Sequence, residues 1–169
     1  MTKKLWTICL MALFALSATA QSHIGKWVSN PETDEDGTMV FVFNFINKKD
    51  IEIGASVSMS DEDAEFNFDI TVPGTYTIKD NTLNLNLDTQ NTKFDIKKMN
   101  FKGETADMIK ESPEVEKMIR NMVTQTLQEQ KGEILKELPV GGDFTIKELT
   151  STRMVLSESE DTITLNKVK

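Results

Sequence analysis

Apolar and polar residues alternate along most of the chain between positions 25 and 101, and this period of two predicts β-strands. The clearest run spans residues 39–46. One of its faces is rich in aromatic side chains and is the candidate interior face: Met39, Phe41, Phe43 and Phe45. The opposite face carries Val40, Val42, Asn44 and Ile46. Short turns rich in Asp, Asn, Pro and Gly separate this strand from its neighbours, which is typical of antiparallel hairpins.

The same alternation continues through residues 51–59, 66–72, 76–87 and 94–101. These segments add four aromatic side chains to the candidate interior: Phe66, Phe68, Tyr76 and Phe94. Pro73-Gly74 predicts a corner or bulge between two strand segments, because proline cannot donate to a sheet ladder. A change of phase near Lys97-Lys98 predicts a second bulge.

The period of two stops after residue 101, and residues 104–138 are predicted to form a helical insert. Ser112-Pro113 supplies an N-cap and a first-turn proline for the longer helix, and Gly132 is a candidate point of division. The apolar stripe of that helix contains Val115, Met118, Ile119, Met122, Val123 and Leu127. Such a stripe has to be buried, so we expect the insert to pack against the strands.

Three further strands are predicted between residues 143 and 168, each separated by a short turn. The last of them is free to pair with the first strand, around Trp27, and this pairing would close the sheet and remove its edges. About nine or ten strand candidates are compatible with a small barrel of roughly eight strands. The sequence therefore predicts a mostly β, antiparallel up-and-down barrel with a helical insert between late strands.

The first twenty residues are typical of an export signal. Lys3 and Lys4 precede an apolar run, and Ala18-Thr19-Ala20 is a small-residue cleavage site. We expect residues 1–20 to be removed and residues 21–169 to form one domain that works in the periplasm or outside the cell. Cys9, the only cysteine, lies in this leader, so no disulfide is expected.

Charge narrows the range of partners. Loss of residues 1–20 leaves 17 basic residues against 27 acidic ones, a net charge of −10. Nucleic acid is excluded as a partner, since its binding draws on clustered lysine and arginine. No segment after the leader is apolar enough to span a membrane.

Few residues are suited to catalysis or metal binding. Without the leader the chain has no cysteine, its one histidine is His23 near the N-terminus, and no Gly-x-Ser-x-Gly motif occurs. Glu32-x-Asp34-x-Asp36-Gly37 resembles the opening half of a calcium loop, but the twelfth position is Phe43, which favours a solvated acidic turn. We therefore expect a protein that is not an enzyme and that needs no cofactor or metal.

Three features occur together in the chain: Gly25-Lys26-Trp27 directly after a signal peptide, a meander of alternating strands, and two closing segments, residues 149–156 and 162–168. In this combination the chain resembles the small secreted bacterial proteins described as lipocalin-like. The resemblance implies a calycin-type barrel with Trp27 near a closed end and a basic side chain across its indole, for which Arg153 is the candidate. The helical insert departs from lipocalins, which place their main helix after the barrel strands.

Two functions remain open. The first is a binding protein that holds a small apolar or amphipathic ligand between the aromatic strands and the methionine-bearing helix. Its candidate site residues are Trp27, Phe41, Phe43, Phe45, Phe66, Phe68, Tyr76, Met118 and Met122. The alternative is a protein–protein interaction or envelope structural module, in which the same aromatic side chains fill the barrel and the insert is a plug.

Overall fold

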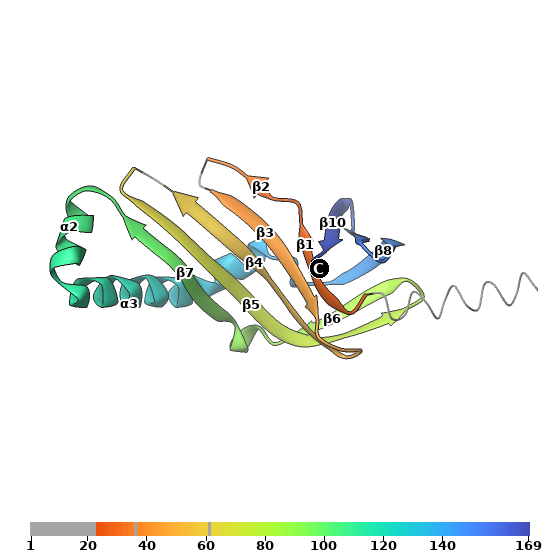
Figure 1. Ribbon diagram of the computed structural model, residues 1–169. Helices are drawn as coiled ribbons and strands as arrows, with labels where there is room; N and C mark the ends of the chain where they lie inside the picture. The colour runs from red at the N-terminus through yellow and green to blue at the C-terminus, as the bar shows by residue number, and fades with distance from the viewer. Residues whose placement is uncertain (1–22, 36, 61) are drawn as a thin grey trace, which may run out of the picture.

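The computed structural model describes residues 23–35, 37–60 and 62–169. The predicted signal peptide and Cys9 lie outside the described residues. The described strands are β1 (Gly25–Ser29), β2 (Glu32–Thr33), β3 (Thr38–Phe45), β4 (Asp50–Ser60), β5 (Ala64–Lys79), β6 (Thr82–Leu87), β7 (Lys93–Phe101), β8 (Asp143–Leu149), β9 (Arg153–Glu158) and β10 (Asp161–Lys167). The described helices are η1 (Thr89–Asn91), α2 (Gly103–Glu111), α3 (Pro113–Glu129) and α4 (Lys131–Glu137) (Figure 1).

Eight of these strands close into an antiparallel barrel in the order β1-β10-β9-β8-β6-β5-β4-β3, and β3 pairs back with β1. The first and last strands meet at Trp27, which is in register with Lys167 of β10 on one side and with Phe43 of β3 on the other. This closure confirms the predicted fold class, including the helical segment between late strands. The architecture is consistent with a lipocalin-like barrel.

Strand β5 runs without a break from Ala64 to Lys79, so the predicted corner at Pro73-Gly74 is wrong. Its first half pairs with β7 and its second half with β6, and the change of neighbour falls at Pro73. The Pro73 carbonyl accepts from the Asp88 amide at 2.8 Å, on the side where β6 ends and η1 begins. A residue in an antiparallel strand directs its N–H and its C=O to the same side. The missing N–H of Pro73 would therefore point between the end of β6 and the start of β7, where no strand carbonyl needs it.

Strands β4, β5 and β7 continue beyond the barrel as a sheet extension, in which β7 pairs with β5 alone. The predicted bulge is confirmed, because Phe68 faces Ile96 whereas Asn67 faces Lys98, which leaves Lys97 as the extra residue. Gly54 allows β4 and β5 to approach closely. A Cβ atom at that position would lie 1.7 Å from the Ile70 carbonyl oxygen.

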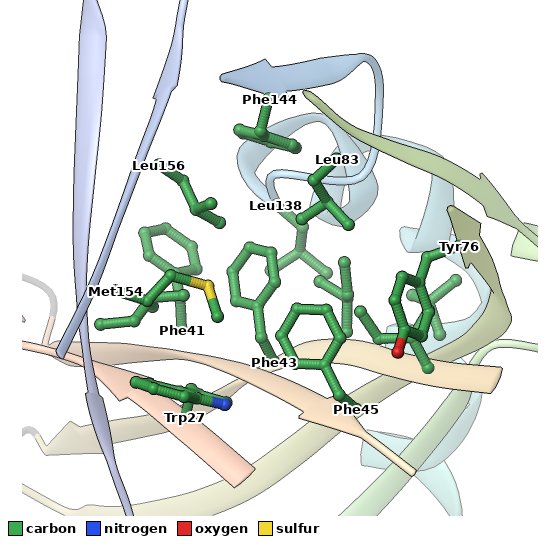
Figure 2. Packing of buried hydrophobic residues seen from close by; sticks show 14 of the residues in the cluster. Trp27, Phe41, Phe43, Phe45, Tyr76, Leu83, Leu138, Phe144, Met154 and Leu156 are labelled. Carbon is green, nitrogen blue, oxygen red and sulfur yellow. The ribbon is translucent and has the colours of Figure 1, made fainter. Parts of the chain in front are cut away.

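One hydrophobic cluster occupies the interior of the barrel (Figure 2). Figure 2 shows side chains from strands on all sides of the barrel pointing toward one another, with Phe43 and Phe45 near the centre. Trp27, Phe43, Leu156 and Leu165 have no exposed surface, and the rings of Phe43 and Phe144 meet edge to face at 6.2 Å. The alternation of the sequence therefore identified the interior face of the barrel strands.

The helical insert leaves the sheet at β7 and returns to it at β8. Helix α3 ends at Glu129, and Gln130 caps both α3 and α4, so the division falls two residues before the predicted Gly132. Ser112 is the N-cap residue of α3, as predicted, although its side chain makes no capping hydrogen bond. Leu138, directly after α4, is 5% exposed and belongs to the core cluster, so the insert is anchored in the barrel by its C-terminal end.

Candidate ligand-binding site

The structure divides the sequence-predicted site residues into three groups. Trp27, Phe41, Phe43, Phe45 and Tyr76 are buried in the barrel core, where they pack against one another. Phe66 and Phe68 are half-buried on the sheet extension. Met118 and Met122 on α3 are 57% and 60% exposed. The predicted residues therefore do not form a single cavity lining, and only the last two groups reach the surface.

The indole of Trp27 lies at the closed end of the barrel, where a basic side chain from a late strand covers it. That side chain is Lys167, whose Nζ lies 5.1 Å from the ring centroid, and not the predicted Arg153. Arg153 precedes the inward-facing Met154, so strand alternation directs it outward, and its Nη1 is 2.9 Å from the Glu148 carboxylate. The type of contact was predictable, but the choice of residue depends on the register between β10 and β1.

A polar contact that the sequence did not indicate closes the same end. His23, the histidine near the N-terminus, is 6% exposed, and its Nε2 lies 2.7 Å from the Tyr76 hydroxyl oxygen. The Tyr76 hydroxyl donates to the Asn47 carbonyl at 2.6 Å, and the Trp27 indole donates to the His23 carbonyl at 2.6 Å. The sequence held one indication that His23 is buried. It precedes Trp27 by four residues, so in an extended strand both side chains lie on the same face.

The sheet extension carries an apolar face that continues the barrel interior outward. We call it the extension face, and its members share one side of β4, β5 and β7: Val57, Met59, Phe66, Phe68, Ile96, Met99 and Phe101. Phe66 and Phe101 meet edge to face with ring centroids 5.6 Å apart. Val57, Phe66, Phe68, Ile96 and Phe101 are only half-buried. Met59, at the end of β4, is 42% exposed, so the face is open on its β4 side.

Helix α3 packs against the β7 side of this face (Figure 1). The Arg120 guanidinium donates to the Ile96 carbonyl oxygen of β7 at 3.1 Å. Met118 and Met122 lie about half a turn around the helix from Arg120, so they project from the flank that turns away from this anchor. Met59 is thus an exposed member of the extension face, and Met118 and Met122 are exposed on the helix that packs against its β7 side.

The described surface contains three hollows, and the third of them reaches Met59 of the extension face. The first, of about 120 Å³, is on the outer face of the barrel over Gly54 and is lined by Lys26, Val42, Asn44, Glu52 and Asp69 among others. The second, of about 630 Å³, lies where β5 exchanges β7 for β6 as its neighbour, and Gly74 and Asp88 are among its lining residues. The third, of about 280 Å³, lies between the turn at Asp34 and Glu35 and the end of β4. Each of the three is lined by a mixture of polar and apolar surface.

The calcium-like segment forms the turn between β2 and β3. Asp34 accepts from the Gly37 amide through its carboxylate at 3.0 Å, and its own amide donates to the Gly37 carbonyl at 3.0 Å. Asp36 lies outside the described residues. Among the residues that are described, no group of three or more His, Cys, Asp or Glu side chains is arranged to hold a metal ion.

One ion pair lies on the side of β5 opposite the extension face. The Glu65 carboxylate binds the Lys98 ammonium at 3.0 and 2.9 Å, and this contact lowers the pKa of Glu65 below its ordinary value.

In the described part of the chain, no helix has the length and apolarity that crossing a membrane requires. Neither a protein-family model nor a curated protein matches this chain, so membership of the lipocalin-like family stays a prediction from the sequence.

Proposed function

We propose that this protein is an exported, non-catalytic binding protein that holds a small apolar or amphipathic molecule against the extension face and α3. The observation that carries the proposal is the exposure of three methionines, Met59 on that face and Met118 and Met122 on the helix that packs beside it. Methionine is flexible and polarisable, and it is well suited to surfaces that adapt to apolar ligands.

The packing of the barrel favours this position over the barrel interior. Phe43 and Phe45 have no exposed surface, and their neighbours fill the space around them. Interiors of this kind are close-packed, and opening one for a ligand would cost the contacts that stabilise it. The extension face needs no such opening, because Phe68 and Met59 are already in contact with solvent.

The experiment compares dye binding by exposed-site variants of residues 21–169. A neutral apolar dye, N-phenyl-1-naphthylamine, should gain fluorescence on binding to the wild-type protein. Met118→Asp and Met122→Asp place a carboxylate on the exposed flank of α3, and each should weaken binding about tenfold or more. Neither substitution should unfold the protein, because both side chains are more than half exposed.

Ile46→Asp is the matched control. Ile46 is 51% exposed, similar to Met118, but it lies in the turn between β3 and β4, at the closed end of the barrel. Binding that survives both methionine substitutions, or that is lost equally in the Ile46 variant, would contradict the proposed position. Absence of any fluorescence gain, together with a bare chain mass in native mass spectrometry of protein purified from the cells that make it, would contradict ligand binding altogether.

One observation favours the alternative, a protein–protein module with a filled core. Val42 lies on the outer side of β3 and lines the hollow over Gly54 together with Lys26 and Glu52. A partner that uses this hollow should be lost from complexes of the Val42→Lys variant, measured by co-purification from the producing cells. Ile78→Lys, an exposed position on β5, serves as the control.

A further inference from the structure

The readily oxidised side chains of this protein are unevenly distributed between the core and the surface. Residues 21–169 contain no cysteine, one tryptophan, one tyrosine and one histidine. The indole of Trp27, the phenol of Tyr76 and the imidazole of His23 are all buried. Methionine, whose thioether sulfur is attacked by two-electron oxidants, is therefore the one readily oxidised residue type that the described part of the chain exposes.

The methionines whose side chains the structure describes differ sharply in exposure. Met154 has no exposed surface, Met99 is buried, and Met39 is half-buried against the core cluster. Three others are exposed, and they are the three methionines of the proposed ligand site: Met59, Met118 and Met122. The sulfur atoms open to oxidants therefore belong to the same residues on which the proposed function depends.

Small oxidants can reach these three residues without any opening of the fold. Met118 and Met122 are four residues apart on α3, so their side chains lie on the same flank of the helix, one turn apart. Met59, near the end of β4, lines the surface hollow of about 280 Å³. Met154 would be reached only after the core opens. Oxidation of the folded protein is thus directed to the exposed methionines.

We propose that hypohalous acids convert Met59, Met118 and Met122 to sulfoxides and that these sulfoxides weaken binding of the apolar ligand. In each reaction the sulfur lone pair bonds to the halogen and displaces hydroxide. Water then adds its oxygen to sulfur, and the halogen leaves as halide with net release of one proton. Sulfur loses two electrons and the halogen gains them. This inference rests on the proposed function, since it concerns the regulation of the same site.

The position of the sulfoxides determines their effect. A sulfoxide is polar, and an apolar ligand that covers it removes its hydrogen bonds to water, so affinity falls. Because the three side chains lie on the surface, the barrel core keeps its packing. Oxidation of Met154 would instead place a polar group inside that core. Methionine sulfoxide reductases of the A and B types reduce the two sulfoxide epimers, so the change at the surface is reversible.

The experiment treats the protein of residues 21–169 with limiting hypochlorous acid and removes the excess. Peptide mass mapping should find an added oxygen on each exposed methionine, while Met99 and Met154 stay reduced. Binding of N-phenyl-1-naphthylamine should weaken about tenfold, with circular dichroism and Trp27 emission unchanged. Treatment with both reductases should restore the affinity.

Leucine variants identify the sulfur atoms responsible, because leucine is apolar, similar in volume and resistant to this reaction. Each variant is compared with its own untreated sample, so the effect of the substitution itself cancels. The triple variant Met59→Leu, Met118→Leu, Met122→Leu should keep its affinity after treatment. Met154→Leu, a buried control, should lose affinity as the wild-type protein does.

Three outcomes would contradict the inference. Dye binding by the wild-type protein that survives sulfoxide formation at all three positions overturns it and leaves the proposed function standing. The same holds if the triple leucine variant loses affinity as strongly as the wild-type protein, because the loss would then arise at other residues. Failure of the untreated protein to bind the dye overturns the proposed function with it.

Discussion

The Nε2 atom of His23 lies 2.7 Å from the hydroxyl oxygen of Tyr76, which itself lies 2.6 Å from the Asn47 carbonyl oxygen. A phenol has one hydrogen, and the Asn47 carbonyl can only accept, so the Tyr76 hydroxyl donates to Asn47 and accepts from His23. His23 therefore carries a proton on Nε2. This chain of hydrogen bonds connects the N-terminal segment, β5 and the turn between β3 and β4 at the closed end of the barrel.

Replacing Tyr76 with phenylalanine should lower the free energy of unfolding by about 1–3 kcal/mol, because the buried His23 Nε2 and the Asn47 carbonyl each lose a partner. Urea denaturation followed by circular dichroism measures the change. Thr77→Val on the same strand is the control. The Thr77 hydroxyl is exposed, and its hydrogen bond to the Asn84 side-chain oxygen is long, at 3.5 Å. This variant should change stability by less than about 0.5 kcal/mol. A similar loss in both variants would show that the hydrogen bonds of Tyr76 contribute nothing specific.

The same hydroxyl should make stability sensitive to alkali. Burial first, and then the nearby Asp50 carboxylate, raise the pKa of Tyr76 above its ordinary value of 10.0. The unfolded chain therefore ionises first, so the contribution of Tyr76 to stability is complete below pH 10 and is lost as the pH rises through the folded-state pKa. Tyr76 is the only tyrosine in the chain, so ultraviolet difference absorbance reports its titration directly.

The difference in unfolding free energy between the wild-type protein and Tyr76→Phe isolates this effect from lysine titration in the same range. We expect this difference to be constant at neutral pH and to decrease above pH 10. Phenol absorbance that changes at or below the ordinary pKa would contradict the burial of the hydroxyl in solution.

Much of this fold was predictable because strand geometry is strict. Alternation alone placed Phe43 and Phe45 inside, since a period of two admits only two faces. The registers between strands were not predictable, and this is why Lys167 and not Arg153 covers Trp27. Pro73 was misinterpreted for a related reason: whether a proline breaks a strand depends on what lies beside it, and that neighbour is distant in sequence.

The candidate site was predictable only in part. The sequence identified Phe68 and Met122 as apolar but could not show that one side of the sheet extension stays open, because coverage depends on how far α3 reaches across it. Met59 was visible as the last member of an alternating strand. Its exposure of 42% reflects its position beyond the barrel, which no local pattern indicates.

Removing the ammonium group over Trp27 should change both fluorescence and stability. Lys167→Met keeps the aliphatic length but loses the charge, and we expect a loss of about 0.5–1 kcal/mol with a shift in tryptophan emission. Trp27 is the only tryptophan of residues 21–169, so the emission has one source. Arg153→Met is the control and should leave the emission unchanged, because Arg153 is bound to Glu148 on the outer face. An emission shift in the Arg153 variant alone would restore the arrangement predicted from the sequence.

Two glycines offer a matched test of the backbone packing in the sheet. Gly54→Ala should destabilise the protein by about 3 kcal/mol or more, since the new Cβ would lie 1.7 Å from the backbone oxygen of Ile70 and would force β4 and β5 apart. Gly132→Ala makes the same chemical change in α4, where nothing lies within 4 Å of the new atom, and it should stabilise the protein by about 0.5–1 kcal/mol.

Thermal denaturation of both glycine variants measures the contrast, and opposite signs are the expected result. The close approach at Gly54 also forms the floor of the hollow lined by Val42 and Asp69. Opposite signs would therefore show that this part of the outer barrel surface is fixed by backbone packing. A tolerated Gly54→Ala would instead mean that β4 and β5 can separate at this point, and the extension face that they carry would then be free to move relative to the barrel.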